Sequence, residues 1–125
     1  MFKPIGGPLV TASGVALPLS SGAEVNDIIY LSGALPFANG KIIGDDIETQ
    51  TNALFDNVEA LLAKEGLTLK NVFKVTVWLV RKQDFAGFNA VYAKRFAQPY
   101  PVRSTVICNL ALDGALIEAE MTVSR

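Results

Sequence analysis

An arginine in the C-terminal part of the chain is the first residue whose type and position point to chemistry. It lies in the segment YPVRST, residues 100–105, where Pro101 precedes a β-branched stretch. Arg103 therefore opens a predicted strand and shares a face with Thr105, because side chains alternate along a strand. A guanidinium in this place can hold a carboxylate through two parallel hydrogen bonds. An arginine that only joins a surface salt bridge fits the same pattern, and the residue type alone favours that simpler interpretation.

Two glutamates on the last predicted strand form a second candidate. Glu118 and Glu120 are two positions apart, which places their side chains roughly 7 Å apart on one face. Burial and a neighbouring carboxylate both raise the pKa of a glutamate. Such a glutamate can position or deprotonate a water molecule. A solvated strand face is the alternative, and it is common in antiparallel sheets.

Three further positions carry weaker signals. Ser32 and Gly33 could shape a binding loop or could be a plain strand-to-turn transition. Asn89 could contact a ligand from the second predicted helix or could be an ordinary surface amide. Cys108 is expected in the core, because an unpaired cysteine usually behaves as a small apolar residue.

Composition narrows the chemistry more than any motif does. The 125 residues include no histidine and one cysteine, which excludes Ser-His and Cys-His nucleophile pairs, an internal disulfide and the usual His/Cys zinc site. The net charge is −1 and the eleven Lys and Arg residues are scattered, so nucleic acid is not an expected partner. No apolar run approaches the ~20 residues of a membrane span. With no secretory signal at the N-terminus, we expect a cytoplasmic protein.

Hydrophobic periodicity predicts one domain over residues 1–125 in which elements follow each other as ββ-α-β-α-ββ. The clearest helix covers residues 46–65, with Asp45 or Asp46 as its N-cap and Gly66 just after its end. A second helix is predicted over 84–98, with Asp84 as its cap. The predicted strands cover 25–32, 41–43, 71–80, 102–110 and 116–124, and a hairpin turn is expected at 39–40. Residues 6–24 are expected to be a loop-rich, extended lead-in.

The strand over 71–80 leaves one face unexplained in a monomer. Alternation divides it into a face of Phe73, Val75, Val77 and Leu79 and a face of Val72, Lys74, Thr76, Trp78 and Val80. The second face is too apolar for a free surface and too polar for a core. A subunit interface accommodates both kinds of residue, so we infer a homo-oligomer built on a mixed sheet with two helices on one face.

Taken together, these segments resemble the RidA/YjgF family, also called the L-PSP family, from about residue 25 to the C-terminus. The matching segments are IYLSGALP at 29–36, QT at 50–51, NV at 57–58, DFA at 84–86 with Asn89 and Tyr92, PVRSTV at 101–106 and IEAE at 117–120. The arginine motif and the closing IEAE strand are the specific ones. Their shared order and spacing argue against chance similarity.

The resemblance implies an α+β fold like that of the small trimeric chorismate mutases, with a mixed sheet of about six strands. Three copies would pack into a central barrel with the helices outside and with sites in the clefts between neighbouring subunits. Family members that carry the arginine hydrolyse reactive enamines and imines, such as 2-aminoacrylate, to a 2-keto acid and ammonia. They require no metal or cofactor. We therefore expect a cofactor-independent enamine/imine deaminase that acts on a small carboxylate substrate.

The resemblance also implies roles for single residues. Arg103 is expected to bind the substrate carboxylate, and Glu118 is expected to orient or activate the attacking water. The remaining pocket positions, which would contact the imine and shape the site, are Ser32, Asn89 and the backbone of Gly33 and Thr105.

This sequence departs from the family pattern at three places. Leu19 stands where many members have a tyrosine, and Ala34 stands where many have a glutamine. The Leu-Pro of the last turn is replaced by ALDG at 111–114. These apolar replacements suggest a bulkier or less polar substrate, or weaker activity.

Two other functions fit the same scaffold. The main alternative is a non-catalytic protein that binds a small carboxylate as a sensor or interaction partner. An endoribonuclease, the label that some family members carry, is disfavoured by the absence of histidine and by the scattered basic residues.

Overall fold

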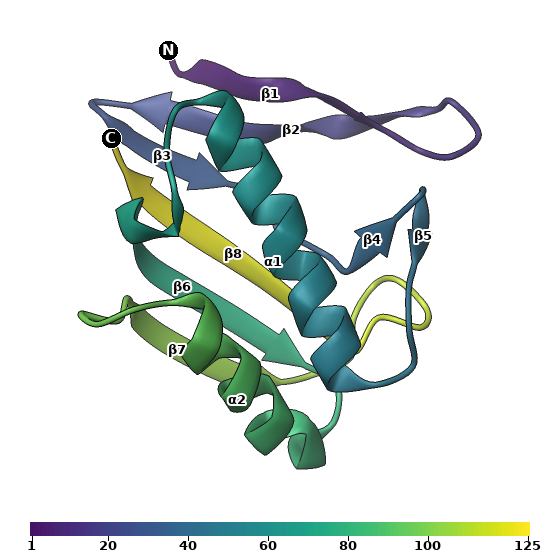
Figure 1. Ribbon diagram of the computed structural model, residues 1–125. Helices are drawn as coiled ribbons and strands as arrows, with labels where there is room; N and C mark the ends of the chain where they lie inside the picture. The colour runs from purple at the N-terminus through teal and green to yellow at the C-terminus, as the bar shows by residue number, and fades with distance from the viewer.

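The computed structural model of residues 1–125 is a mixed six-stranded sheet with both helices against one face, as the sequence predicts (Figure 1). The strands are β1 (Lys3–Val10), β2 (Ala16–Val25), β3 (Ile28–Leu31), β4 (Phe37–Ala38), β5 (Lys41–Ile42), β6 (Val72–Leu79), β7 (Val102–Ile107) and β8 (Ile117–Ser124), and the helices are α1 (Ile47–Lys64) and α2 (Phe85–Arg95). The sheet has the order β1-β2-β3-β8-β6-β7, and β6 with β7 is its one parallel pair. The strands β4 and β5 form a separate hairpin around the expected turn at Asn39 and Gly40.

The core lies between the helices and the face of the sheet that they cover. Its largest fully buried side chains include Phe55 and Leu54 of α1, Phe88 of α2, and Ile117 and Met121 of β8. The opposite face of the sheet has no covering element in this chain (Figure 1). No helix combines the length and apolar character that a membrane crossing requires.

The N-terminal segment differs from the prediction. Residues 6–24 are not a loop-rich lead-in, because they belong to the antiparallel β1–β2 hairpin. Glycine and proline hide these strands in the sequence. The edge strand β1 tolerates both residues since its outer side needs no partner, and Pro18 of β2 lies outside the part that pairs with β3. The expected strand over 25–32 is also too long: Asn26 and Asp27 have φ values of 50° and 65° and form a tight turn into β3.

The helix α1 forms where the sequence predicts it. Asp46 is the N-cap, because its carboxylate accepts a hydrogen bond from the Thr49 N–H at 2.9 Å. This bond from the Thr49 backbone lowers the pKa of Asp46 below its ordinary value. At the other end Gly66 has a φ of 71°, a left-handed conformation that glycine adopts without strain.

The start of β6 contradicts the simple alternation of faces. A register shift against β8 lies between Val72 and Lys74. It turns Val72 into the core, with 6% of its surface exposed, and leaves Phe73 43% exposed. The predicted face assignment is therefore wrong at these two residues and correct from Val75 onward, because a bulge inserts one residue and reverses the alternation before it.

The helix α2 starts where the sequence predicts but ends earlier. Asp84 is the N-cap residue, yet its side chain makes no capping bond: the buried carboxylate instead accepts two hydrogen bonds from the Arg81 guanidinium, at 2.8 and 3.0 Å. The helix ends at Arg95 rather than at residue 98, since Phe96 adopts an extended conformation and packs into the core.

The bulge in β6 predicts opposite sensitivities at two neighbouring residues. Val72→Asn should lower the free energy of unfolding by about 2–4 kcal/mol, because it buries an amide without a partner. Phe73→Asn should cost clearly less, because Phe73 is 43% exposed. Urea unfolding of the two variants measures the difference. A greater loss for Phe73→Asn would mean that the strand alternates without a bulge.

Candidate functional site

Arg103 lies on the edge strand β7 and points toward the helices. It pairs in register with Val75, a core residue of β6, so its side chain is on the helix-covered face of the sheet. Its guanidinium carbon lies 4.7 Å from the ring centroid of Tyr92, 5.0 Å from that of Phe88 and 5.8 Å from that of Phe85. We call these three rings the aromatic cup.

The aromatic cup comes from one stripe of α2. Positions 85, 88 and 92 are spaced by three and four residues, so they project from the same side of the helix. The cup attracts the cation through the faces of the rings but does not neutralise its charge. The Arg103 side chain has neither an ion pair nor a hydrogen bond in this chain. Its N–H groups therefore remain free for an anion.

Two hydroxyl groups close to Arg103 in the fold are also without partners. The Tyr92 hydroxyl and the Thr105 Oγ1 are buried and make no hydrogen bond within the chain. Burial raises the pKa of Tyr92, and the positive charge of Arg103 partly opposes this shift. Tyr92 is thus a neutral phenol beside an uncompensated cation.

Glu118 lies on the opposite, uncovered face of the sheet. It pairs with Trp78 of β6, whereas its neighbours Ile117 and Ala119 point into the core. Burial raises the pKa of Glu118, and the like charge of Glu120 raises it further. Glu118 therefore has the raised pKa that the sequence predicts for one of the two glutamates. Glu120 lies exposed beside it on the same face.

Gly33 lies directly against the Glu118 carboxylate. A Cβ atom at this position would overlap Glu118 Oε2, so no larger residue fits without moving the carboxylate. The neighbouring Ala34 keeps Gly33 close to Glu118 through two backbone hydrogen bonds with Ala119, at 2.7 and 3.1 Å. The structure thus brings together Gly33 and Glu118, two of the residues proposed from the sequence.

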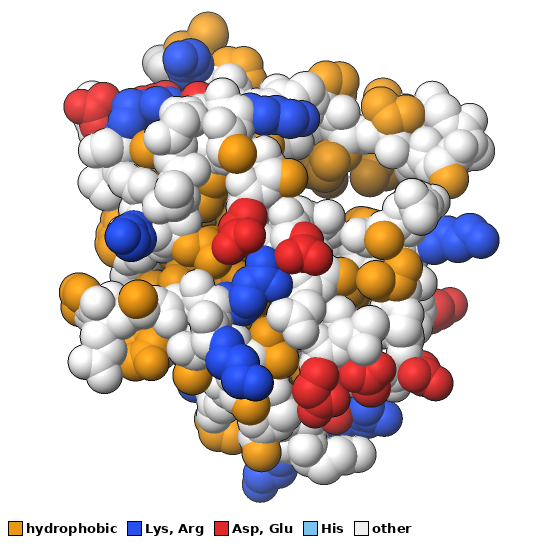
Figure 2. Space-filling model, in the orientation of Figure 1, with side chains coloured by type: hydrophobic (Ala, Val, Ile, Leu, Met, Phe, Trp, Pro, Cys, Tyr) orange, Lys and Arg blue, Asp and Glu red, His pale blue; other side chains and the backbone are white.

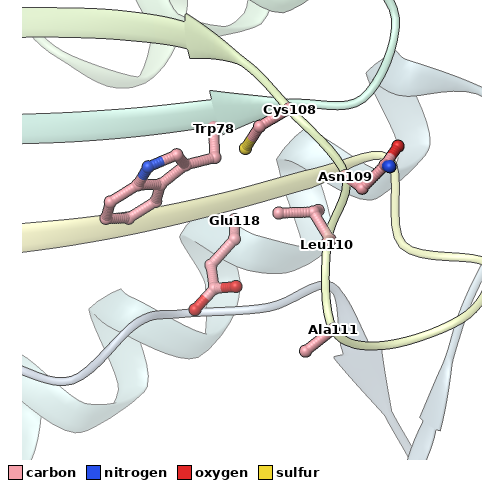
Figure 3. A pocket seen from close by; sticks show the side chains of 6 residues that line it. All are labelled: Trp78, Cys108, Asn109, Leu110, Ala111 and Glu118. Carbon is pink, nitrogen blue, oxygen red and sulfur yellow. The ribbon is translucent and has the colours of Figure 1, made fainter.

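A hollow of about 230 Å³ opens beside Glu118 (Figure 3). Its lining residues are Trp78, Cys108, Asn109, Leu110, Ala111 and Glu118. In Figure 3 the side chains of Trp78, Leu110 and Glu118 face the same space, while the Asn109 amide points away from it. The wall is mainly apolar, and Glu118 is its one charged member.

Cys108 is not the core residue that the sequence suggests. It follows the end of β7, is half-buried and lines the hollow at Glu118. The hollow lies on the uncovered face of the sheet, where no core surrounds the thiol. No group of three or more His, Cys, Asp and Glu side chains comes together in a metal-binding arrangement.

The other proposed residues lie apart from one another. Thr105 shares the helix-covered face with Arg103, since it pairs with Val77. The Ser32 hydroxyl donates to the Ser20 carbonyl at 2.6 Å, and Asn89 is half-buried on α2. Leu19 is 42% exposed on β2 and does not line the hollow at Glu118.

The decisive geometry is that Arg103 and Glu118 are on opposite faces of one sheet. Their strand partners Val75 and Trp78 alternate along β6 and so project in opposite directions. One chain therefore does not bring these two residues to the same small ligand. Sequence reasoning proposed both residues and placed Trp78 on an interface face, but it missed Leu110 as a pocket wall because contacts made by a loop leave no periodic signal.

The Tyr92 hydroxyl has no partner, so removing the hydroxyl and removing the ring should affect stability differently. Tyr92→Phe should leave the free energy of unfolding unchanged or raise it by up to about 1 kcal/mol, because it removes an unsatisfied buried hydroxyl. Tyr92→Leu should lower it by about 1–3 kcal/mol, because the ring contacts with Phe55, Phe88, Phe96 and Arg103 are lost. Chemical denaturation measures both. A marked loss for Tyr92→Phe would show that the hydroxyl has a stabilising partner.

Comparison with known proteins agrees with this architecture. Residues 11–124 match the family model described as Endoribonuclease L-PSP. The Lactococcus lactis protein named "Putative regulator AldR" is 39% identical over 106 residues, which are 83% of this chain and 84% of that protein. "Reactive Intermediate Deaminase A, chloroplastic" of Arabidopsis thaliana is 34% identical over 90 residues, 70% of this chain and 48% of that protein. The chloroplast location in this last name gives no support to the expected cytoplasmic location.

A solved structure extends the agreement to the whole fold. The crystal structure of YyfA from Yersinia pestis, described as a member of the conserved Rid protein family, matches with a TM-score of 0.89 and 28% identity over 100% of both chains. Because the family model also spans nearly the whole chain, this protein belongs to the RidA/YjgF family, also called the L-PSP family.

Proposed function

We propose that this protein hydrolyses reactive enamine or imine intermediates that carry a carboxylate, releasing a 2-keto acid and ammonia. The observation that carries the proposal is the Arg103 guanidinium, which is held in the aromatic cup without any anionic partner. An uncompensated cation with free N–H groups is a receptor for a carboxylate. The name of the Arabidopsis relative, a reactive intermediate deaminase, supports the same class of reaction.

The reaction requires little beyond a substrate carboxylate held in position and a water molecule held next to the C=N carbon. An enamine becomes the imine when one proton is lost from nitrogen and one is gained on carbon, and water then adds to the C=N carbon. Glu118, whose pKa is raised by burial, accepts a proton from the attacking water and returns it to the nitrogen. The hydroxyl proton of the adduct then passes through the same carboxylate to the nitrogen, the C–N bond breaks, ammonia leaves and the carbonyl forms. Nothing is oxidised or reduced in this hydrolysis, so the mechanism contains no redox step.

The site in this proposal is shared between two copies of the chain. Arg103 and Glu118 project from opposite faces of the sheet, so a cleft containing both needs Arg103 from one copy and Glu118 from the next. The uncovered face also carries exposed Tyr30, Val102 and Val106, an arrangement that a second copy would cover. A closed homotrimer, as the family resemblance implies, would repeat this contact three times.

The remaining predicted residues fit around this cleft in the proposal. The backbone of Gly33 and of Thr105 would face the imine, with Ser32 and Asn89 shaping the pocket. Leu19 and Ala34 would make its rim less polar than in relatives with tyrosine and glutamine. The substrate expected from these residues is a small 2-imino acid with an uncharged side chain.

A carboxylate-binding protein without turnover is the second candidate. It is favoured by the 39% identity with the protein named "Putative regulator AldR". Calorimetry with 2-keto acids separates the two functions, because binding with no ammonia release would favour the regulator. RNA cleavage is not proposed: the chain has no histidine, and acidic and basic side chains are interspersed on the face in Figure 2.

Removing the guanidinium should abolish the reaction. Arg103→Ala should lower kcat/KM by about 10²- to 10³-fold, because two charge-assisted hydrogen bonds are lost. Arg103→Lys should recover little of it, since an ammonium keeps the charge but not the planar fork. The assay follows ammonia and 2-keto acid formed from an imine that an amino-acid oxidase or dehydratase generates in place.

A matched control for this test is Arg95. It also lies over an aromatic ring, 5.3 Å from the Phe55 centroid, but it is already paired with Asp56 and Glu59 at 2.9 and 3.2 Å. Arg95→Lys should therefore leave the rate unchanged. Equal rates for the wild-type protein and Arg103→Ala would contradict the proposed function.

Mixing two inactive variants tests whether the site is shared. Arg103→Ala and Glu118→Gln should each be inactive alone. In a randomly mixed cyclic assembly, about a quarter of the clefts would combine an intact Arg103 from one copy with an intact Glu118 from its neighbour. Differently tagged copies purified through both tags should therefore recover activity. Purified mixed assemblies that stay inactive would place both residues in a cleft formed by one chain.

A further inference from the structure

Gln50 is a fully buried amide on α1 that the proposed reaction does not use. None of its surface is exposed, although glutamine is usually a surface residue. Its Nε2 donates hydrogen bonds to the carbonyl oxygens of Gly44, at 3.1 Å, and Gly114, at 2.8 Å. Its Oε1 accepts one from the Leu116 N–H at 2.7 Å. Since a buried amide is tolerated only with such partners, this residue imposes a fixed geometry on the segments that it joins.

One of these segments is the loop between β7 and β8, which depends on Gln50. The loop is tied to the sheet at its ends, where the Cys108 N–H donates to Leu79 and the Leu116 carbonyl accepts from Val80. Within residues 109–115, the bond from Gln50 to Gly114 is the only hydrogen bond that leaves the loop. Figure 1 shows this loop beside β5 at the N-terminal end of α1.

The same loop supplies most of the wall of the hollow at Glu118. Four of the six lining residues, at positions 108–111, belong to it (Figure 3). Leu116, whose N–H Gln50 holds, comes two positions before Glu118 itself. The amide thus connects α1 to the far end of the loop whose residues 108–111 form this wall, at Gly114 and Leu116.

A second amide on α1 provides a comparison. Asn57 lies seven positions after Gln50, on the same side of the helix. Its Nδ2 donates to the carbonyl oxygens of Leu35 and Phe37, at 3.0 and 2.9 Å. That segment has an additional tether in the backbone pairing of Ala34 with Ala119. The backbone tethers of the loop lie at Cys108 and Leu116, outside residues 109–115, so the position of residues within the loop depends on Gln50.

We propose that Gln50 is a positioning residue that sets the side-chain preference of the site by holding the wall formed by residues 108–111. This inference rests on the proposed function. In the proposal the substrate carboxylate lies on Arg103, and the substrate side chain lies in the apolar hollow next to Glu118. A fixed wall discriminates among side chains by size. Without the amide the loop relaxes, Leu110 and Ala111 no longer limit the space, and the discrimination weakens.

The test compares the preference for a bulky apolar imine over the smallest imine. In Gln50→Leu this ratio of kcat/KM values should rise by about tenfold or more relative to the wild-type protein, because the wall no longer limits the space for the bulky side chain. The amount of folded enzyme cancels in the ratio, so simple destabilisation does not alter it. If Gln50→Leu does not fold, Gln50→Glu retains the acceptor for Leu116 and loses the amide donors, and it should move the ratio in the same direction. An unchanged ratio in the folded variant would overturn the inference.

Asn71 offers a matched control. Its amide also bridges backbone groups, since it donates to the Ser124 carbonyl at 3.0 Å and accepts from the Thr68 N–H at 3.1 Å. These partners lie at the far end of β8 from Glu118. Asn71→Ala should therefore lower stability without changing the ratio. A change as large as that in Gln50→Leu would show that any lost amide has this effect.

Two measurements without substrate separate this inference from the proposed function. Trp78 is the single tryptophan and lies on the wall opposite the loop. Gln50→Leu should shift its emission to longer wavelength and speed hydrogen exchange at the Leu116 N–H by about tenfold or more, whereas Asn71→Ala should do neither. If the wild-type protein turns over no imine but these changes occur, the proposed function fails and the wall-holding role of Gln50 stands. Wild-type emission and exchange in Gln50→Leu would overturn the role itself.

Discussion

The pairing of β8 with β3 on one side and β6 on the other determines where the functional groups of this chain lie. Ile117 and Val123 are fully buried by this pairing, and the residues between them alternate between the core and the uncovered face. A shift of one residue would exchange the two sets and bury both glutamates under the helices. The apolar half of β8 thus fixes the register, and the register fixes Glu118 beside Trp78 and Gly33.

Two charged groups are left without compensation by this arrangement. Arg103 has its charge over aromatic rings with no anion nearby, and Glu118 is partly buried next to another carboxylate. Each of these states is unfavourable in an isolated chain, and each is improved by a group of opposite charge. The positive group is at the edge strand on the helix side, and the negative group is on the uncovered face. In the proposed shared cleft, one copy of the chain would supply the positive group and its neighbour the negative group.

Most of the architecture could be predicted because the core elements have strong periodicity. Both helices, the strands β6, β7 and β8, and the position of Glu118 on an uncovered face follow from apolar spacing. The β1–β2 hairpin was missed because glycine and proline on an edge strand resemble a loop. The bulge in β6 left no mark in the sequence, since valine and phenylalanine fit either face.

Contacts that depend on tertiary structure were beyond sequence reasoning. Asp84 resembles a helix cap until Arg81 is seen to occupy its carboxylate. Gln50 was visible as part of a family pattern, but its three backbone partners are separated from it by up to 66 positions. The separation of Arg103 and Glu118 onto opposite faces required the register of β6 with both of its neighbours.

The position of β8 in the sheet has a consequence for how the chain folds during synthesis. This strand comes last in the sequence but lies in the middle of the sheet, between β3 and β6. Until residues 117–124 have left the ribosome, the N-terminal strands and the β6–β7 pair have no common partner, and the apolar sides of both helices stay uncovered. Completion of the sheet must therefore wait for β8, and any chain that stops before it exposes a large apolar surface to chaperones and proteases.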